Sequence, residues 1–171
     1  MSFSSFVMNY ASTFPSPIGP LTAVVDEDGA LTELRFERQP PPRDVVWDEE
    51  RCAHVRRELD EYFAGGRREF SIALKPRGTE WQQRVWAALL GIPCGATIDY
   101  RERAARAGNP RAVRAAGRAN ATNPIPILIP CHRVVGTHGS LTGYGGGLDA
   151  KEMLLRLEGA RSPVTSAATG G

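Results

Sequence analysis

The chain has 171 residues, of which 42% are hydrophobic, so it is long and apolar enough to form one ordinary domain or two small ones. Residues 1–11 show no basic start or sustained apolar run, and no apolar stretch has the length of a membrane span, so we expect a cytoplasmic protein with no membrane partner. The net charge of +2 conceals an asymmetry: residues 1–78 carry 10 basic and 13 acidic side chains and residues 79–171 carry 11 and 6, which makes the second half the candidate for binding a polyanion.

The amino-terminal part alternates short apolar and polar runs over residues 7–37. Turn sequences interrupt these runs at residues 16–20 and 28–29, which predicts antiparallel strands joined by turns. Residues 70–74 favour one more short strand. We therefore expect this part of the chain to form a small antiparallel sheet.

A helix is predicted between Asp48, its expected cap, and Gly65, which ends it, because apolar residues recur there on one face. Cys52 lies on that face and is expected in the core. Cys52 and His54 are two residues apart on this helix, so they point about 200° apart and cannot easily share a metal ion. The three cysteines have unrelated spacings, so neither a disulfide framework nor a metal site is expected.

The linker between the two halves is expected at residues 75–78. It separates an α/β scaffold domain, residues 1–76, from a mainly helical domain, residues 77–160, and the small polar residues 161–171 form a tail expected to be disordered. The fold class is therefore α+β. The second domain begins with a helix that Thr79 and Gln82 cap as a capping box.

Two short helices are predicted next, over residues 100–107 and 110–121, with Asn109 as the cap of the second. This is the helix-turn-helix pattern. On the second helix Arg111, Arg114 and Arg118 fall within about 60° of one another. Six arginines and one acid lie between residues 100 and 118, which favours contact with phosphates, although a solvated helix face would show the same stripe.

The apolar run over residues 124–130 ends at Cys131, which is followed by His132 and Arg133. The thiolate is the reactive form of cysteine, and cationic or imidazole neighbours stabilise it below the free pKa of roughly 8.5. Cys131 is therefore a candidate nucleophile. The alternative is an inert buried cysteine, because cysteine is among the residues most often buried.

A glycine-rich loop follows over residues 137–147, with Tyr144 within it, and precedes the last helix. Such a loop lets backbone amides approach a ligand, but it would also serve as a plain connector. Glu158 lies at the end of the last helix, where the helix dipole disfavours an acid. It is therefore either exposed or held by a partner.

Together these segments resemble the O6-alkylguanine-DNA alkyltransferases, also called methylated-DNA–protein-cysteine methyltransferases. The resemblance covers residues 79–159 almost continuously and is weaker before them, where it depends mainly on residues 16–22. Its motifs are Asn-Pro-Ile-Pro at 123–126, Ile-Pro-Cys-His-Arg-Val-Val-Gly at 129–136 and Leu-Thr-Gly-Tyr-x-Gly-Gly-Leu at 141–148, with x at Gly145.

The resemblance implies a ribonuclease-H-like amino-terminal domain and an irreversible transfer of the alkyl group from O6-alkylguanine to Cys131, once per molecule and without a cofactor or a metal. O6-methylguanine is the expected substrate, with O4-methylthymine as a second one. His132 would relay a proton from Cys131 through a water to Glu158, and Asn123 would brace the turn before the nucleophile.

The resemblance also assigns the residues around the damaged base. Tyr100, Pro126, Val134, Tyr144 and Gly145 would contact the flipped base, and Arg114 would fill the gap that it leaves. The protein would bind duplex DNA through the minor groove as a monomer, with cooperative binding left open. The remaining DNA contacts would come from Asn109, Arg111, Ala115, Gly117, Arg118 and Thr137. The chain departs from the common pattern at Asp99, where a serine is usual, and at Arg118.

Two other classes remain open on the sequence. A helix-turn-helix regulator would read bases in the major groove but would need neither the Cys131 motif nor the glycine loop. A cysteine hydrolase would need an oxyanion hole and would turn over repeatedly. The number of alkyl groups transferred per molecule separates all three.

Overall fold

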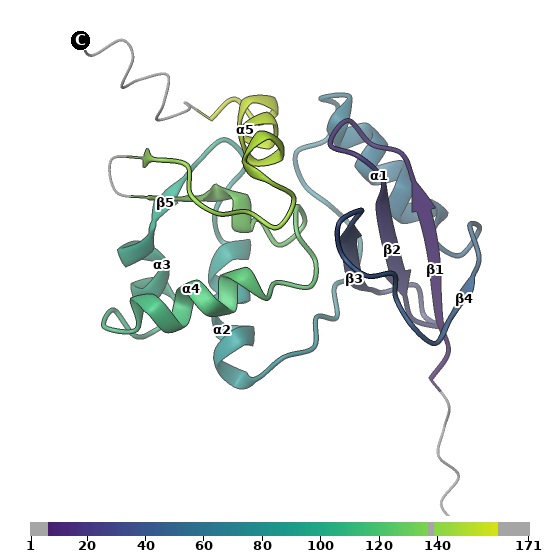
Figure 1. Ribbon diagram of the computed structural model, residues 1–171, viewed down its shortest axis with the longest axis horizontal. Helices are drawn as coiled ribbons and strands as arrows, with labels where there is room; N and C mark the ends of the chain where they lie inside the picture. The colour runs from purple at the N-terminus through teal and green to yellow at the C-terminus, as the bar shows by residue number, and fades with distance from the viewer. Residues whose placement is uncertain (1–6, 137–138, 161–171) are drawn as a thin grey trace, which may run out of the picture.

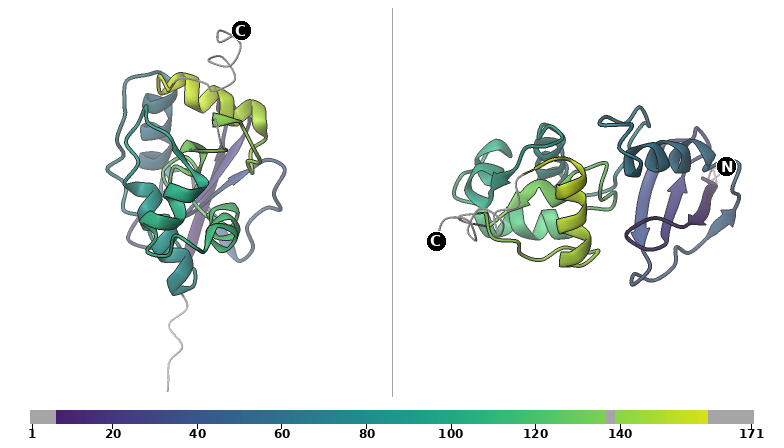
Figure 2. Two further views of the ribbon diagram at one scale, coloured as in Figure 1. Left: turned by 90° about the vertical axis from the view of Figure 1, so that its left-hand side faces the viewer. Right: turned by 90° about the horizontal axis from the view of Figure 1, so that it is seen from above.

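The computed structural model describes residues 7–136 and 139–160. A part that contains a sheet and a helical part lie side by side, as Figure 1 and the right-hand view of Figure 2 show. The α+β class is therefore confirmed. Thr137 and the tail at residues 161–171 lie outside the described residues, so the predictions made for them stay untested.

The main sheet has the strand order β3-β2-β1-β4. Its strands are β1 (Asn9–Phe14), β2 (Leu21–Val25), β3 (Leu31–Phe36) and β4 (Val45–Trp47). The first three pair antiparallel as predicted, but β4 pairs parallel with β1, so the sheet is mixed. With only three residues, β4 is too short to show the alternation by which strands are predicted. The strand predicted at residues 70–74 is reduced to a single bridge between Leu31 and Leu74.

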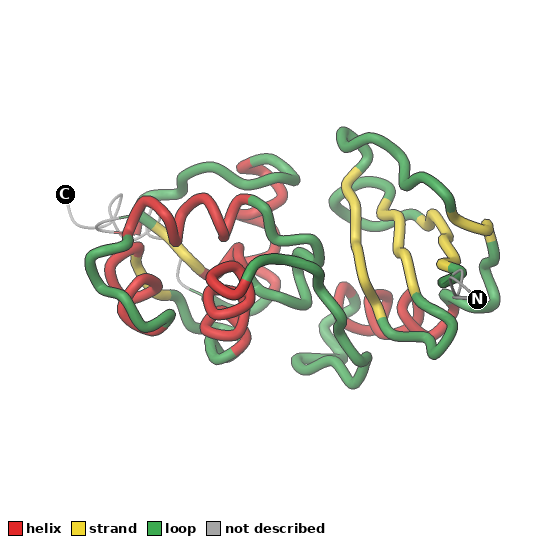
Figure 3. The backbone as a smooth tube through the Cα atoms, turned by 90° about the horizontal axis from the view of Figure 1, so that it is seen from below, coloured by secondary structure: helices red, strands yellow, loops and turns green. Residues whose placement is uncertain are grey.

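Helix α1 (Ala53–Phe63) lies across one face of this sheet (Figure 3) and buries Val55, Leu59 and Tyr62. It begins five residues after Asp48, its predicted cap. The Asp48 carboxylate instead accepts the backbone N–H of Arg51 at 3.1 Å, so it closes the turn before the helix. The predicted start was wrong because the same side-chain bond serves turns and helix caps equally well.

The helical part contains four α-helices, a short 3-10 helix and a two-stranded parallel pair within the described residues. These elements are α2 (Glu80–Leu90), β5 (Ile98–Asp99), α3 (Tyr100–Arg106), α4 (Val113–Ala121), η1 (Cys131–Arg133), β6 (Val134–Val135) and α5 (Leu148–Leu157). The predicted capping box of Thr79 and Gln82 is present at the start of α2.

The helix-turn-helix consists of α3 and α4, which pack on each other and on α2. Asp99 caps α3 by accepting the N–H of Glu102 at 2.9 Å, so it fills the role that a serine would have at this position. Helix α4 begins at Val113, three residues later than predicted. Asn109 is therefore not its cap, and its side chain accepts the N–H of Arg111 in the preceding turn.

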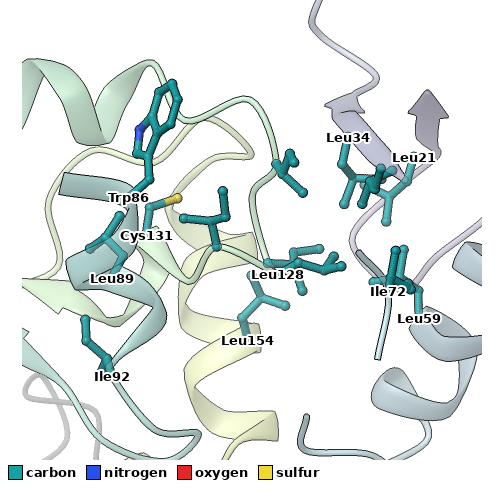
Figure 4. Packing of buried hydrophobic residues seen from close by; sticks show 14 of the residues in the cluster. Leu21, Leu34, Leu59, Ile72, Trp86, Leu89, Ile92, Leu128, Cys131 and Leu154 are labelled. Atoms are coloured by element: carbon teal, nitrogen blue, oxygen red, sulfur yellow. The ribbon is translucent and has the colours of Figure 1, made fainter. Parts of the chain in front are cut away.

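One hydrophobic cluster runs through both parts of the chain. Figure 4 shows Leu34 and Leu59 on the sheet side of it and Trp86 and Cys131 on the helical side. The Leu34 N–H also donates to the Pro124 carbonyl at 2.8 Å, which joins the edge strand β3 to the segment before the cysteine. Among the described helices, none is long and apolar enough to cross a bilayer.

Candidate active site

The segment before Cys131 is fixed by the side chain of Asn123. The Asn123 carbonyl oxygen accepts the N–H of Ile125 at 2.9 Å, and its amide donates to the carbonyl of Ile129 at 2.8 Å. Between these bonds Ile127 has a φ of 75°, which is rare for a β-branched residue and persists only where the surroundings impose it. Asn123 therefore braces the turn that leads from α4 into η1.

Cys131 opens into a cavity of about 570 Å³. The same cavity is lined by every residue predicted to contact the base, namely Tyr100, Pro126, Val134, Tyr144 and Gly145. Phe36 and Gln39 of the sheet-containing part line it too, and the Phe36 ring meets the Tyr144 ring edge-on with centroids 5.6 Å apart. Both parts of the chain therefore build this pocket.

The Cys131 thiol is almost completely enclosed, with 7% of the residue exposed. Burial raises its pKa, and the nearby Asn123 amide and Lys151 ammonium offset only part of that effect. The sequence led us to expect neighbours that hold Cys131 as a thiolate. In the free protein the thiol form is favoured instead, so its proton has to leave during the reaction.

His132 and Glu158 lie behind the cysteine, and both are buried. The His132 Nε2 is 2.8 Å from Glu158 Oε2, so the predicted partner of Glu158 is present. Glu158 also accepts the Tyr62 hydroxyl at 2.6 Å and two N–H groups of Arg133 at 2.8 and 2.9 Å. Burial alone would raise the pKa of Glu158, but the hydrogen bonds from His132 and Arg133 hold it at about 2.

The ionised Glu158 carboxylate fixes the tautomer of His132. Because that carboxylate only accepts hydrogen bonds, the proton of a neutral imidazole lies on Nε2, which leaves Nδ1 as the basic nitrogen. Burial, together with the charges of Arg133 and Lys151, lowers the pKa of His132 although the Glu158 carboxylate raises it, so the ring is neutral. His132 Nδ1 is itself buried without a hydrogen-bond partner in the part of the chain that the structure describes. It is therefore free to accept a proton.

Arg103 and Lys151 also line the cavity, although neither was expected there from the sequence. Only 4% of Arg103 and 2% of Lys151 is exposed. Lys151 Nζ donates to the carbonyl of Thr142 at 2.9 Å, and burial lowers the pKa of its ammonium to about 8. Their spacing on the helices could have indicated this position, because residues three apart share a helix face. Arg103 lies three residues after Tyr100, and Lys151 lies three before the buried Leu154.

The arginines expected to contact DNA are on the surface. Arg114 and Arg118 are exposed one turn apart on α4, and Arg111 is exposed in the turn before it, so the predicted stripe is only partly helical. Asn109 is exposed as well, whereas Ala115 is half-buried. Gly117 lines the cavity, and a Cβ atom there would lie 3.3 Å from the Arg103 guanidinium.

No cluster of three or more His, Cys, Asp or Glu side chains within residues 7–136 and 139–160 could hold a metal ion. Cys52 is buried in the core, and burial followed by the charge of Asp48 raises its pKa to about 11. Cys94 does not line the cavity that holds Cys131. The cavity therefore offers Cys131 as its thiol and His132 as a base behind it.

Two family models match the chain. Residues 9–76 match the ribonuclease-like domain of 6-O-methylguanine DNA methyltransferase, and residues 80–160 match its DNA binding domain. These ranges leave out residues 77–79, where the linker was expected to end.

Curated relatives and solved structures agree with these matches. A methylated-DNA–protein-cysteine methyltransferase of Methanosarcina acetivorans is 48% identical, with 88% of this chain and 99% of that protein covered. One of Mycobacterium tuberculosis is also 48% identical, with 92% and 96% covered. The crystal structure of Mycobacterium tuberculosis OGT in complex with DNA is similar with a TM-score of 0.83 and 46% identity, covering 91% of this chain and 98% of that one.

Proposed function

The chain belongs to the 6-O-methylguanine DNA methyltransferase family, and from this premise we propose that it repairs DNA by transferring the alkyl group of O6-alkylguanine to its own Cys131. The proposal rests on one observation: Cys131 lines the same cavity as Tyr100, Val134 and Tyr144. A sulfur–carbon bond forms as the bond between the alkyl carbon and O6 breaks. Guanine leaves with the electron pair and takes up a proton.

His132 is the base for the thiol proton. Its Nδ1 accepts that proton through a water, because no direct hydrogen bond joins Cys131 to His132 within the described residues. The Glu158 carboxylate stabilises the imidazolium that forms, and Arg133 and Tyr62 keep this carboxylate ionised and oriented. Tyr100 lines the same cavity, and its hydroxyl supplies a proton to the departing guanine.

The base has to leave the duplex to reach this cavity, because O6 lies inside the stacked and paired helix. Flipping costs a few kcal/mol, and the damaged base pair lowers this cost. Arg114 on the exposed face of α4 takes the place of the flipped base. Arg111 and Arg118 contact the phosphates, and the half-buried Ala115 lets α4 approach the minor groove closely.

We propose that each molecule acts once, as a monomer, since no second thiol lines the cavity to accept the alkyl group from Cys131 within the described residues. O6-methylguanine is the primary substrate, and O4-methylthymine presents a similar O-methyl group. That the protein acts in the cytoplasm is a prediction from the sequence.

The test is to count alkyl groups per molecule on duplex DNA that contains O6-methylguanine, with Cys131→Ser as the matched control. Mass spectrometry should find one added methyl group on the peptide with Cys131 and none in the control. Repeated turnover would indicate a hydrolase, and a methyl group on Cys52 or Cys94 would mean that the nucleophile is wrongly assigned. Binding without any transfer would leave a DNA-binding regulator.

A further inference from the structure

The pocket around Cys131 carries two buried cations. Arg103 and Lys151 both line it and are 4% and 2% exposed. Among the described residues that line this pocket, none is an aspartate or a glutamate. Buried charges in proteins are normally paired, so a pocket with two cations and no carboxylate is unusual.

Arg103 is the less satisfied of the two. Its Nε is buried without a hydrogen-bond partner, and its guanidinium forms no ion pair within residues 7–136 and 139–160. The guanidinium lies over the Tyr100 ring, with its central carbon 5.0 Å from the ring centroid. Gly117 leaves the room for it, because a Cβ there would come within 3.3 Å of the Arg103 Nη2. Arg103 is thus held in the pocket by packing, and its N–H groups remain available to a ligand.

The positive charges of both cations favour the thiolate form of Cys131, and the charge of Arg103 disfavours the charged form of Lys151. The thiolate that forms during transfer supplies one negative charge for two positive ones. Lys151 already donates to the Thr142 carbonyl, whereas Arg103 has no such acceptor. A second anion would therefore complete the site, and the group closest to Cys131 in the reaction is the alkyl substituent itself.

We propose that the Arg103 and Lys151 pair binds a negative charge on the alkyl group, so that the protein prefers O6-alkylguanines whose alkyl group ends in a carboxylate over neutral ones of the same size. O6-carboxymethylguanine is the smallest of these. The inference rests on the proposed alkyl transfer and specifies its substrate class. The Cys131 thiolate attacks the CH₂ carbon, the bond from that carbon to O6 breaks, and guanine leaves with the electron pair and is protonated. The products are guanine and an S-carboxymethyl group on Cys131, whose carboxylate stays beside Arg103.

The two cations also reduce a repulsion that would otherwise slow this reaction. A thiolate and a carboxylate approach within one small cavity, and like charges at short range repel strongly where water is excluded. A guanidinium binds a carboxylate with two parallel N–H groups, which matches the free N–H groups of Arg103.

The phosphate of the flipped nucleotide is the other source of an anion, and two matched substrates separate it from the alkyl group. O6-carboxymethylguanine and O6-carbamoylmethylguanine have nearly the same size and differ in charge, and in one duplex sequence they share every phosphate. A cation that binds phosphate, or one that only stabilises the thiolate, affects both substrates equally. A cation that binds the alkyl carboxylate changes the ratio of the two rates.

The experiment measures single-turnover rates on both duplexes for the wild type, Arg103→Leu and Arg106→Leu. Arg106 lies on the same helix but is exposed and paired with Glu102, so its loss removes the same charge outside the pocket. We expect Arg103→Leu to lower the ratio of the charged to the neutral substrate about ten- to a hundredfold, and Arg106→Leu to leave it unchanged. If Arg103→Leu does not fold, Arg103→Gln, which keeps length and polarity, takes its place.

An unchanged ratio in the Arg103 variant would overturn the inference, as would a wild type that reacts more than about tenfold faster with the neutral substrate. A third duplex with O6-methylguanine keeps this outcome separate from the proposed function. If the wild type repairs O6-methylguanine but fails the ratio test, the proposed function stands and only the inferred substrate preference is wrong. If the wild type repairs none of the three duplexes, both the proposed function and the inferred preference are wrong.

Discussion

The Tyr62 hydroxyl donates a 2.6 Å hydrogen bond to Glu158 Oε2 across 96 positions of sequence. Tyr62 lies on α1 of the sheet-containing part, and Glu158 ends α5 of the helical part, next to α1 in Figure 1. Glu158 in turn holds His132, the residue after the nucleophile. The sheet-containing part is therefore joined to the proposed base, in addition to supporting the fold.

Tyr62→Phe should slow alkyl transfer about two- to tenfold, because Glu158 loses one of its hydrogen bonds while the ring packing against Phe70 remains. Folding stability should fall by about 1–2 kcal/mol. Single-turnover rates on O6-methylguanine duplex and thermal unfolding measure the two effects. Tyr10→Phe is the matched control, since no hydrogen bond to the Tyr10 hydroxyl is formed by the described residues. A rate equal to that of the control would show that the bond serves stability alone.

Glu158→Gln should slow transfer by roughly ten- to a hundredfold and move the pH profile of the rate to higher pH. Without the carboxylate, His132 loses the negative charge that stabilises its imidazolium, so the Cys131 proton leaves less readily and less thiolate forms at neutral pH. The measurement is the single-turnover rate between about pH 6 and pH 9. Glu152→Gln is the control, because Glu152 pairs with Arg156 on the surface of the same helix. An unchanged rate and profile would remove Glu158 from the proton path.

The same carboxylate should make folding stability depend on acid. The pKa of Glu158 is lowered from 4.5 to about 2 in the folded protein, where burial opposes and the bonds from His132 and Arg133 outweigh it. A lowered folded-state pKa stabilises the protein above pH 4.5, and this contribution is lost as the pH falls from 4.5 to about 2. Urea unfolding across this window should show a decline in the free energy of unfolding that is smaller in Glu158→Gln. An equal decline in both proteins would assign the acid sensitivity to other carboxylates.

The sequence predicted those parts of the site that lie in short motifs. Asn123, Cys131 and His132 belong to one characteristic motif at residues 123–136. The position of Glu158 at a helix end already indicated a partner. Asn123 and Cys131 line one cavity and His132 contacts Glu158, while the roles of these residues remain proposed.

The contributions from distant segments could not be predicted in this way. In the sequence, Tyr62 and Phe36 look like ordinary core residues of the sheet-containing part. No pattern in the neighbouring sequence indicates that α1 contacts the end of α5 or that β3 borders the cavity. Arg103 looked like one more member of an arginine-rich surface, and only its packing over the Tyr100 ring and against Gly117 distinguishes it. The start of α4 was misplaced because Asn109 and Pro110 satisfy the rules for a helix start and also those for a turn.

The preference for a carboxylate-bearing alkyl group should depend on pH through Lys151. Burial lowers the pKa of this ammonium to about 8, Cys131 acts in the opposite direction, and Arg103 adds to the lowering. Above that pH Lys151 loses its charge, so the ratio of carboxymethyl to carbamoylmethyl rates should fall between about pH 7 and pH 9. Lys151→Met should show a lower ratio at pH 7 and little further change. A wild-type ratio that is constant over this range would assign the preference to Arg103 alone.

Arg114→Ala should separate DNA handling from chemistry. Arg114 is exposed on α4 and Cys131 is buried on η1, so loss of Arg114 leaves the cavity intact. If Arg114 replaces the flipped base, its loss should slow repair of duplex DNA by roughly ten- to a thousandfold, because flipping costs a few kcal/mol. The free base O6-benzylguanine is already unstacked, and its reaction should be nearly unchanged. Single-turnover rates on both substrates measure the difference.

Arg111→Ala and Arg118→Ala are the matched controls for Arg114→Ala, because all three remove an exposed arginine from the same surface. Where these side chains contact only phosphates, each loss should weaken duplex binding and lower its salt dependence by about one unit of slope. Saturating DNA should then restore the rate of both controls but not that of Arg114→Ala, since a flipping defect persists in the bound complex. An equal loss on free base and duplex in Arg114→Ala would mean that Arg114 supports the fold of the active site, and recovery at saturating DNA would make it one more phosphate contact.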